Sequence, residues 1–296
     1  MHEDYNLFVA IVEAGSLSAA GRRLRISPAM VSKRLARLEA RLGATLVHRT
    51  TRRLLLTEVG QGFHEDACHI LDAIRAAEAR VAGRIGQAGG RLRVSAPTSF
   101  GRMHVAPYLK AFLDRFPRIE LSLDLDDGFV DLLGERIDIA IRIAAQPGGS
   151  LIGHRLAENR RVLCAAPAYL AAHGAPETLA DLSKHRLLAA DHQLPWRLEG
   201  PDGPVSLDGA SAVRTNSSEV ARELTIAGLG IALRSTWDVG PSLRDGSLVR
   251  ILPEVSGATD VAIYAVQPRG AAGAPNPRAF VDHFHALFSP VPPWDR

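Results

Sequence analysis

A cluster of basic side chains near the N-terminus is the feature of the sequence that most clearly suggests chemistry. Residues 1–60 hold ten basic and five acidic residues, a net charge of +5, whereas residues 61–296 hold 25 basic and 27 acidic residues, a net charge of −2. Because arginine and lysine neutralise phosphates and release counterions, this distribution predicts a polyanionic partner, although a solvated surface would look the same by charge alone. The basic residues are Arg22, Arg23, Arg25, Lys33, Arg34, Arg37, Arg41, Arg49, Arg52 and Arg53.

Other chemistry-bearing residues form weaker patterns. The segment HEDACH places His64 and Cys68 on one helix face beside His69, but one His–Cys pair supplies too few ligands for a metal site. No GxSxG, HExxH or phosphate-loop motif is present, and His283 and His285 would point apart on a helix. We therefore expect no metal, no cofactor and no enzymatic activity. A different class of protein remains open as the alternative to a non-enzymatic nucleic-acid-binding protein. It is a solute-binding or hydrolytic α/β protein that carries a basic nucleic-acid-binding head.

The composition is typical of a soluble multidomain protein. The chain has 296 residues, of which 46% are hydrophobic and 23% are charged, so two or three domains are expected. The N-terminus lacks the features of a signal peptide, and no apolar run approaches the length of a membrane span. Cys68 and Cys164 show no CxxC spacing and are expected to be free thiols, so we predict a cytoplasmic protein with no membrane partner.

Short helices are predicted at the N-terminus. Apolar residues at positions i, i+1, i+4 and i+5 predict a helix over residues 4–14, which Gly15 ends. Either Ser16 or Ser18 can cap a second helix, whose small residues would allow close packing.

A third helix is predicted over residues 28–42. Ser27 supplies a capping hydroxyl, Pro28 occupies the first helical position, and Gly43 ends the helix. Two short helices joined by a tight turn form a helix-turn-helix, and residues 44–57 predict a basic hairpin after it. The inward-facing stripe of the third helix consists of Val31, Leu35, Leu38 and Leu42.

The N-terminal residues resemble a known family. The stretch AGSLSAAGRRLRISPAMVSKRLARLEARLGATLVHRTTRRLLLTEVG is similar to the winged helix-turn-helix of LysR-type transcriptional regulators, through the framework AA…L…SP..VS..L..LE..LG…L..R…LT..G. The resemblance implies that Pro28, Ala29, Ser32 and Lys33 face base edges. It also implies that Arg34, Arg49, Arg52 and Arg53 lie near phosphates or the minor groove. Ser27, Arg37 and Thr51 are further candidate DNA-binding residues.

One departure from the family concerns Pro28. Many members have glutamine at this position, so a side-chain donor to the bases is absent. Readout is therefore expected to depend on apolar contact, on Ser32 and Lys33, and on DNA shape.

A long helix is predicted after the head. Thr57 can cap it, no proline follows until well past residue 85, and apolar residues recur at the a and d spacing of a coiled coil. Packing on its own chain is one explanation for the stripe, whereas the family resemblance implies a homodimer or homotetramer. The residues of the predicted dimerisation seam are Phe63, Ala67, Ile70, Ile74, Ala77 and Val81.

The remainder of the chain alternates strands and helices, which predicts parallel-sheet α/β units. Strands are expected at 91–97, 119–125, 137–143, 160–167, 230–234 and 261–266, and helices at 102–116, 129–134, 277–288 and from Pro167 and Asn216. The segments DLLGERIDIAIRIA, AAPAYLAAHGAPETLADLSKHRLL and AGLGIALR resemble the LysR effector domain, which is similar to periplasmic binding proteins.

An effector site is expected where strands end and helices begin, because ligands of open α/β sheets bind there and helix N-termini attract anions. The candidate residues follow the first strand and precede the helix near 218, with an arginine at the end of each of two strands. They are Thr98, Ser99, Thr215, Asn216, Ser217, Arg142 and Arg234. The hydroxyl and amide side chains would equally serve as helix caps. The pattern weakly favours a small organic acid as the effector.

The predicted fold class is multi-domain. It comprises an all-α winged helix-turn-helix domain (1–57), a linker helix (58–86), a hinge (87–90) and a two-lobed α/β effector domain (91–296). Lobe one is expected to comprise 91–160 and 266–296, and lobe two 161–265. The resemblance implies a DNA-binding transcriptional regulator whose partners are double-stranded promoter DNA, a small-molecule effector, a second copy of itself and RNA polymerase. Its effector would shift the equilibrium between two oligomer arrangements.

Overall fold

The computed structural model describes residues 2–49, 54–81, 88–128, 132, 134–148, 151–269 and 274–296. The chain divides into two compact units, residues 1–86 and 87–296. Each unit has its own hydrophobic core. None of the described helices combines the length and the apolar character that a membrane span requires.

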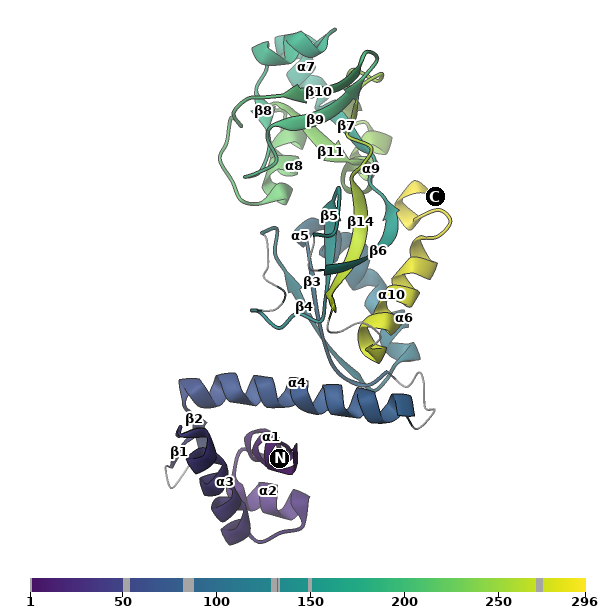
Figure 1. Cartoon of the computed structure of the whole chain (residues 1–296). Helices are drawn as coiled ribbons and strands as arrows, with labels where there is room; N and C mark the ends of the chain where they lie inside the picture. The colour runs from purple at the N-terminus through teal and green to yellow at the C-terminus, as the bar shows by residue number, and fades with distance from the viewer. Residues whose placement is uncertain are drawn as a thin grey trace. The chain divides into compact units, whose positions relative to one another are not determined.

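The first unit consists of short helices, a small hairpin and one long helix (Figure 1). Its elements are α1 (His2–Ala14), α2 (Leu17–Leu24), α3 (Pro28–Leu42), β1 (Val47–Arg49), β2 (Leu54–Leu56) and α4 (Glu58–Val81). The core contains Leu7, Phe8 and Ile11 of α1, together with Val31, Leu35 and Leu38 of α3. The predicted stripe of α3 is thus confirmed except at Leu42, which is 38% exposed at the end of the helix.

Capping residues set the limits of the short helices. The Ser16 hydroxyl accepts the Ala19 N–H at 3.2 Å, so Ser16 rather than Ser18 caps α2. The Ser27 hydroxyl accepts the Met30 N–H at 3.2 Å, and Pro28 follows at the first position of α3, as predicted. Gly43 ends α3 with a φ of 67°, a left-handed conformation that glycine adopts without a steric penalty.

The hairpin is fixed to α3 by a single carboxylate. The side chain of Glu39 accepts the N–H groups of Leu46 at 2.8 Å and Val47 at 3.2 Å. Strand β1 then pairs antiparallel with β2, with Val47 opposite Leu56. The predicted hairpin is confirmed in its strands, whereas residues 50–53 at its tip lie outside the described residues.

Helix α4 begins against the hairpin. The Thr57 hydroxyl accepts the Gly60 N–H at 2.9 Å and donates to the Thr45 carbonyl at 2.8 Å. A Cβ atom at Gly60 would lie 1.9 Å from the Leu46 carbonyl oxygen, so only glycine allows this close approach. The helix is described as far as Val81, and residues 82–87, which include its predicted C-terminal end, lie outside the described set.

In the second unit, lobe one is built on a five-stranded sheet in the order β4-β3-β5-β14-β6. Strand β3 is parallel to β4 and β5, whereas β14 is antiparallel to β5 and β6. Helices α6 and α10 contribute Phe112, Phe280 and Phe284 to the core on this sheet. The elements are β3 (Gly90–Ala96), α5 (Thr98–Phe100), α6 (Leu109–Arg115), β4 (Ile119–Leu125), β5 (Ile139–Ala144), β6 (Leu151–Glu158), β14 (Ala262–Pro268) and α10 (Pro275–Phe288).

Lobe two contains a four-stranded sheet in the order β12-β7-β11-β8 and a three-stranded sheet in the order β10-β9-β13. Its helices are α7 (Pro167–His173), α8 (Ser218–Ile226) and α9 (Thr236–Asp245). Its strands are β7 (Arg161–Ala165), β8 (Leu187–Leu188), β9 (Trp196–Gly200), β10 (Gly203–Leu207), β11 (Ile231–Ser235), β12 (Val249–Arg250) and β13 (Ser256–Gly257). The Cys164 thiol is buried in β7, which raises its pKa to about 12 and keeps it protonated.

Several predictions for the second unit were wrong. Two sheets are mixed rather than parallel, because β14 returns to lobe one and β7 runs antiparallel to β11. The β10-β9-β13 sheet is antiparallel throughout. Strand β14 begins at Ala262, so the chain re-enters lobe one before residue 265. The helix predicted over 102–116 begins earlier, at Thr98, with a π-helical segment at Gly101–Val105. The helix predicted at 129–134 is not one of these errors: it falls largely outside the described residues and stays a prediction.

The two lobes are joined by a buried contact. Trp237 at the start of α9 packs into the core of lobe one, and its indole N–H donates to the Asn159 side chain at 2.9 Å. The ring of His104 in lobe one lies 3.0 Å, by its Nε2, from the Trp237 carbonyl oxygen. These contacts fix the two lobes to one another where the chain crosses between them.

Candidate functional site

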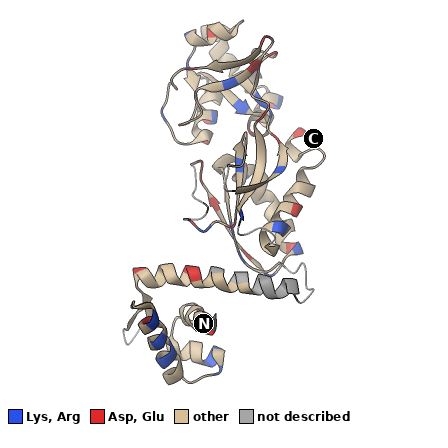
Figure 2. Ribbon diagram, in the orientation of Figure 1, with Lys and Arg blue, Asp and Glu red and all other residues tan. Residues whose placement is uncertain are grey.

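Two regions gather the residues that the sequence singled out, and the first is the exposed side of α3. Lysine and arginine lie along this helix (Figure 2). Because Val31, Leu35 and Leu38 face the core, the opposite side of the helix is presented to solvent. The exposed residues near its N-terminus are Ser27, Pro28, Ala29, Met30, Lys33 and Arg37, and Ser32 is half-buried.

The N-terminal turn of α3 offers few polar atoms to a ligand. The Ser27 hydroxyl already accepts a backbone N–H as the helix cap, and Pro28 has neither a backbone nor a side-chain donor. Side-chain hydrogen bonding from this part of α3 therefore depends on the Ser27 O–H, which the cap leaves able to donate, and on Ser32 and Lys33, with apolar contact from Ala29.

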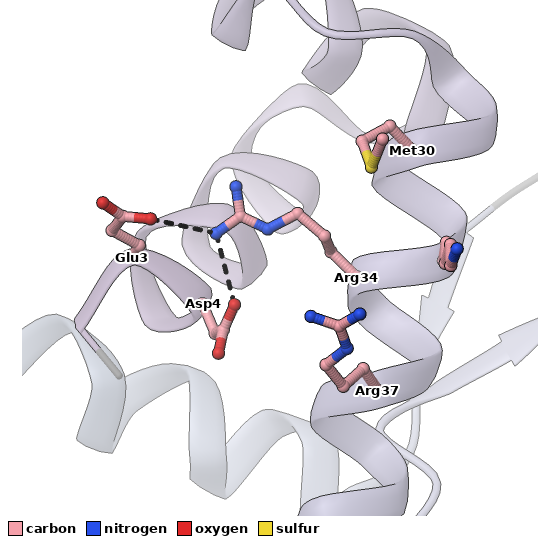
Figure 3. A pocket seen from close by; sticks show the side chains of 6 residues that line it. Glu3, Asp4, Met30, Arg34 and Arg37 are labelled. Carbon is pink, nitrogen blue, oxygen red and sulfur yellow. Dashed lines mark hydrogen bonds and ion pairs between the residues drawn. The ribbon is translucent and has the colours of Figure 1, made fainter.

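Arg34 is engaged within the protein. Its guanidinium lies 3.2 Å from Asp4 and 3.6 Å from Glu3, both in the first turn of α1, and points toward them in Figure 3. Asp4 also pairs with Arg41 at 3.3 Å. The guanidinium group expected near a phosphate is thus held by carboxylates. The Arg34 and Asp4 side chains are only 28% and 22% exposed, so this pair is screened less by solvent than a pair on the open surface.

Lys33 and Arg37 are the available cations of α3. Within the described residues both are exposed and neither forms a recorded hydrogen bond or ion pair. Arg49 ends β1, but its side chain is outside the described set, as are Thr51, Arg52 and Arg53 entirely.

The second region lies at the carboxyl ends of β3, β4 and β5. Thr98 follows β3, and its N–H donates to the Asp127 carboxylate at 2.7 Å, just beyond the end of β4. Arg142 in β5 donates to the Gly128 carbonyl at 3.1 Å. The three strands are parallel, so their ends converge, and this brings the predicted residues Thr98 and Arg142 to one loop.

Lobe two contributes the N-terminus of α8 to the same loop. The Ser218 N–H donates to the second oxygen of Asp127 at 3.0 Å. Arg234 and Gln193 both donate to the Ser218 hydroxyl, at 2.9 and 3.1 Å respectively. The Asp127 carboxylate therefore accepts backbone N–H groups from both lobes. The predicted residue Arg234 donates to the side chain of Ser218, which supplies one of these N–H groups.

Arg234 belongs to a buried ionic network. Its Nε donates to the Asp238 carboxylate at 2.8 Å, and Arg222 donates to the other oxygen of Asp238 at 3.2 Å. The Asp238 side chain is completely buried and that of Arg234 is 4% exposed. Burial of this extent demands paired charges, so Arg234 positions Ser218 rather than standing free for a ligand.

The remaining predicted residues have different environments. The Ser99 hydroxyl is buried and has no hydrogen-bond partner within the described residues. Thr215 accepts the Ser217 N–H at 3.1 Å, and the Ser217 hydroxyl accepts the Val220 N–H at 3.4 Å, so both stabilise the start of α8. Asn216 is exposed.

Sequence reasoning missed Asp127, although it had pointed to the residues that lead into the helix near 218, where Ser218 lies. Asp127 carried a usable signal, because it follows a predicted strand as part of an Asp126-Asp127-Gly128 turn. Nothing in the sequence indicated that its partner would be a helix N-terminus 91 residues away.

Arg142 is partly withdrawn from water. Burial lowers the pKa of its guanidinium, while Asp126 and Glu135 oppose this effect by their negative charge. An arginine so placed stays protonated and is well suited to a charge-assisted bond with an acid.

The predicted dimerisation seam in α4 is only partly available. Phe63 packs against Tyr5 and Phe8, with ring centroids 5.3 Å from each, and Ala67 is fully buried. Phe63 therefore packs against the head's own core, which the heptad spacing did not reveal. Ile70 is 41% exposed and Ile74 is half-buried. The side chains of Ala77 and Val81 lie outside the described set.

Comparison with known proteins identifies both units. Residues 2–61 match the family model of the bacterial regulatory helix-turn-helix protein, lysR family. Residues 86–289 match the family model of the LysR substrate binding domain.

Individual relatives agree with these matches. The chain is 38% identical to the HTH-type transcriptional regulator DmlR of Escherichia coli K12, over 85% of this chain and 83% of DmlR. It is 35% identical to the transcriptional activator TtdR of the same strain, over 88% of this chain and 86% of TtdR.

Solved structures show the same two-part architecture. The full-length Vibrio cholerae virulence activator AphB matches with a TM-score of 0.61 at 29% identity, over 97% of this chain and 99% of that chain. CrgA of Neisseria meningitidis matches with a TM-score of 0.60 at 29% identity, over 97% and 98%. With a helix-turn-helix head and an effector-binding unit, the chain belongs to the LysR family of transcriptional regulators.

Proposed function

We propose that this regulator recognises double-stranded DNA through the N-terminal half of α3 and responds to a small carboxylate held between the lobes of its effector domain. The observation that carries the effector class is the Asp127 carboxylate, which accepts N–H groups from Thr98 and Ser218. These two donors have the spacing and polarity that a carboxylate requires. A free organic acid of similar shape can use the same donors, with Arg142 nearby to balance its charge.

The DNA-binding proposal is tested by footprinting. We expect a protected site of several tens of base pairs, and we expect Lys33→Ala to weaken specific binding more than nonspecific binding, because Lys33 lies on the reading side of the N-terminal turn. Lys110→Ala is a matched control, since Lys110 is an exposed lysine of the other unit. Smooth, salt-sensitive binding to any sequence would contradict the proposal.

The effector proposal is tested by thermal unfolding in the presence of small carboxylates. A ligand at a hundredfold excess over its Kd stabilises a protein by about 2.7 kcal/mol, which corresponds to an increase in Tm of roughly 5–11 °C for a unit of this size. Arg142→Ala should abolish the increase, whereas Arg155→Ala, an exposed arginine of the same sheet, should not. The absence of any response at millimolar concentrations would refute the proposed effector class.

The exposed part of α4 supports a homodimer. Ile70 remains 41% exposed on a helix that continues away from the head core, and an apolar stripe of this kind is stabilised by a second copy. Light scattering at micromolar concentration should give at least twice the mass of the chain, and Ile70→Glu should reduce it. A wild-type monomer under these conditions would refute the dimer.

A further inference from the structure

The carboxylate of Asp127 already occupies the donors that the effector site offers. One of its oxygens accepts the Thr98 N–H at 2.7 Å and the other accepts the Ser218 N–H at 3.0 Å. These donors belong to different lobes. One carboxylate thus closes a link between lobe one and lobe two at the place proposed for the effector.

The neighbouring acids behave differently. Asp126 accepts the N–H of Gly128, two residues away in its own turn, at 2.6 Å. Asp124 pairs with Arg93 within the sheet of lobe one at 3.4 Å. Among these three carboxylates, only that of Asp127 reaches an atom of the other lobe.

The link formed by Asp127 is exchangeable. Asp127 is exposed, precedes a glycine and accepts only backbone N–H groups in its recorded hydrogen bonds, so another carboxylate can replace it without loss of hydrogen bonds. The lobes also have independent contacts, between Arg102 and Glu219 and between His104 and the Trp237 carbonyl. Removing Asp127 therefore leaves the lobes joined.

We propose that Asp127 is an internal competitor of the effector, which occupies the site in the effector-free protein and which the acid group of the effector displaces. This inference rests on the proposed function, because it assigns the regulation of the same site. In the effector-free protein the Asp127 side chain links the lobes. When the effector is bound, the effector forms this link instead, so the link then depends on the effector concentration.

An internal competitor lowers the apparent affinity to the intrinsic affinity multiplied by the fraction of molecules in which the site is free. If Asp127 occupies the donors in about nine molecules of ten, its removal tightens carboxylate binding about tenfold. The effect should be shared by acids of different size, since it comes from the unbound protein. A change confined to one acid would instead indicate a direct contact between Asp127 and that ligand.

The test compares Asp127→Ala with Asp124→Ala in the full chain. Both variants lose one exposed carboxylate near the end of β4, but only the first loses the link to Ser218. Calorimetric titration with acetate and with succinate should give about tenfold tighter binding to Asp127→Ala than to the wild type, and unchanged binding to Asp124→Ala. Equal or weaker binding to Asp127→Ala would overturn the proposal.

Hydrogen–deuterium exchange gives a second measurement that needs no effector response. Peptides containing Thr98 and Ser218 should exchange faster in Asp127→Ala than in the wild type, and acetate should restore their protection in the variant. Unchanged exchange in the variant, or acetate without effect on it, would refute the internal competitor. If acetate restores protection while the wild type responds to no acid, the competitor stands and only the proposed effector class fails.

Discussion

Gly60 and Gly62 lie two residues apart in α4, and we expect alanine at these positions to have opposite effects on stability. A Cβ atom at Gly60 would lie 1.9 Å from the carbonyl oxygen of Leu46 and 2.8 Å from its carbonyl carbon. Both atoms are backbone, so the hairpin and the helix must separate. At Gly62 no atom of the described residues lies within 4 Å of the added carbon, apart from the neighbouring residues and the helix's own adjacent backbone.

The expected magnitudes follow from these distances. Overpacking against a fixed neighbour typically costs about 1–3 kcal/mol, so Gly60→Ala should lower the free energy of unfolding of the first unit by at least this amount. Alanine is favoured over glycine within a helix by roughly 0.5–1 kcal/mol, so Gly62→Ala should raise it. For a unit of this size each kcal/mol shifts Tm by roughly 4–8 °C.

The assay can separate the two units because the three tryptophans, Trp196, Trp237 and Trp294, all belong to the second. Far-ultraviolet circular dichroism reports the helices of both units, whereas tryptophan fluorescence reports only the second. Gly60→Ala should move the circular dichroism transition of the first unit to lower temperature and leave the fluorescence transition unchanged. Shifts of the same sign in Gly60→Ala and Gly62→Ala would refute the assignment of close packing at Gly60.

Three further predictions concern other parts of the molecule. Asp238→Ala leaves the buried guanidinium groups of Arg222 and Arg234 without their shared carboxylate. It should lower the unfolding free energy of the second unit by about 3–5 kcal/mol, measured by tryptophan fluorescence in urea. A loss below about 1 kcal/mol, the size expected for a surface pair, would contradict the buried network. Arg37→Ala should weaken specific and nonspecific DNA binding alike. It should also reduce the magnitude of the slope of log affinity against log salt concentration by about 0.9, because one phosphate contact is lost. An unchanged slope would exclude that contact. Burial lowers the pKa of His104 in the folded protein below its ordinary 6.5. The stability contributed by its neutral ring is therefore present above pH 6.5 and is lost as the pH falls through the lowered pKa of the folded protein. His104→Gln should flatten the decline of Tm on acidification, and an equal decline in the variant would assign that decline to other groups.

The head could be predicted closely because its signals are local. Ser27, Pro28 and Gly43 determine the ends of α3 through contacts within a few residues, and the apolar spacing determines which side is buried. The position of the Arg34 side chain could not be predicted in this way. It depends on carboxylates 30 residues earlier, which only the packing of α1 on α3 brings close.

The second unit was harder to predict for the same reason. Its mixed sheets depend on where β14 and β7 pair, and strand pairing is not encoded in the spacing of the strand itself. Thr98 and Arg142 could be proposed because strand ends are visible in the sequence. Asp127 and Ser218 acquire their roles from a contact between lobes, so no local pattern distinguishes Asp127 from Asp126.

The packing of Phe63 on Tyr5 and Phe8 has a consequence for anyone who recombines regulators of this kind. A chimaera joined at Thr57, where the sequence suggests that the head ends, would transplant a domain without part of its core. Retaining α4 beyond Ala67 keeps that core complete. The functional module that evolution or an engineer can exchange is therefore the head together with the first turns of its connecting helix.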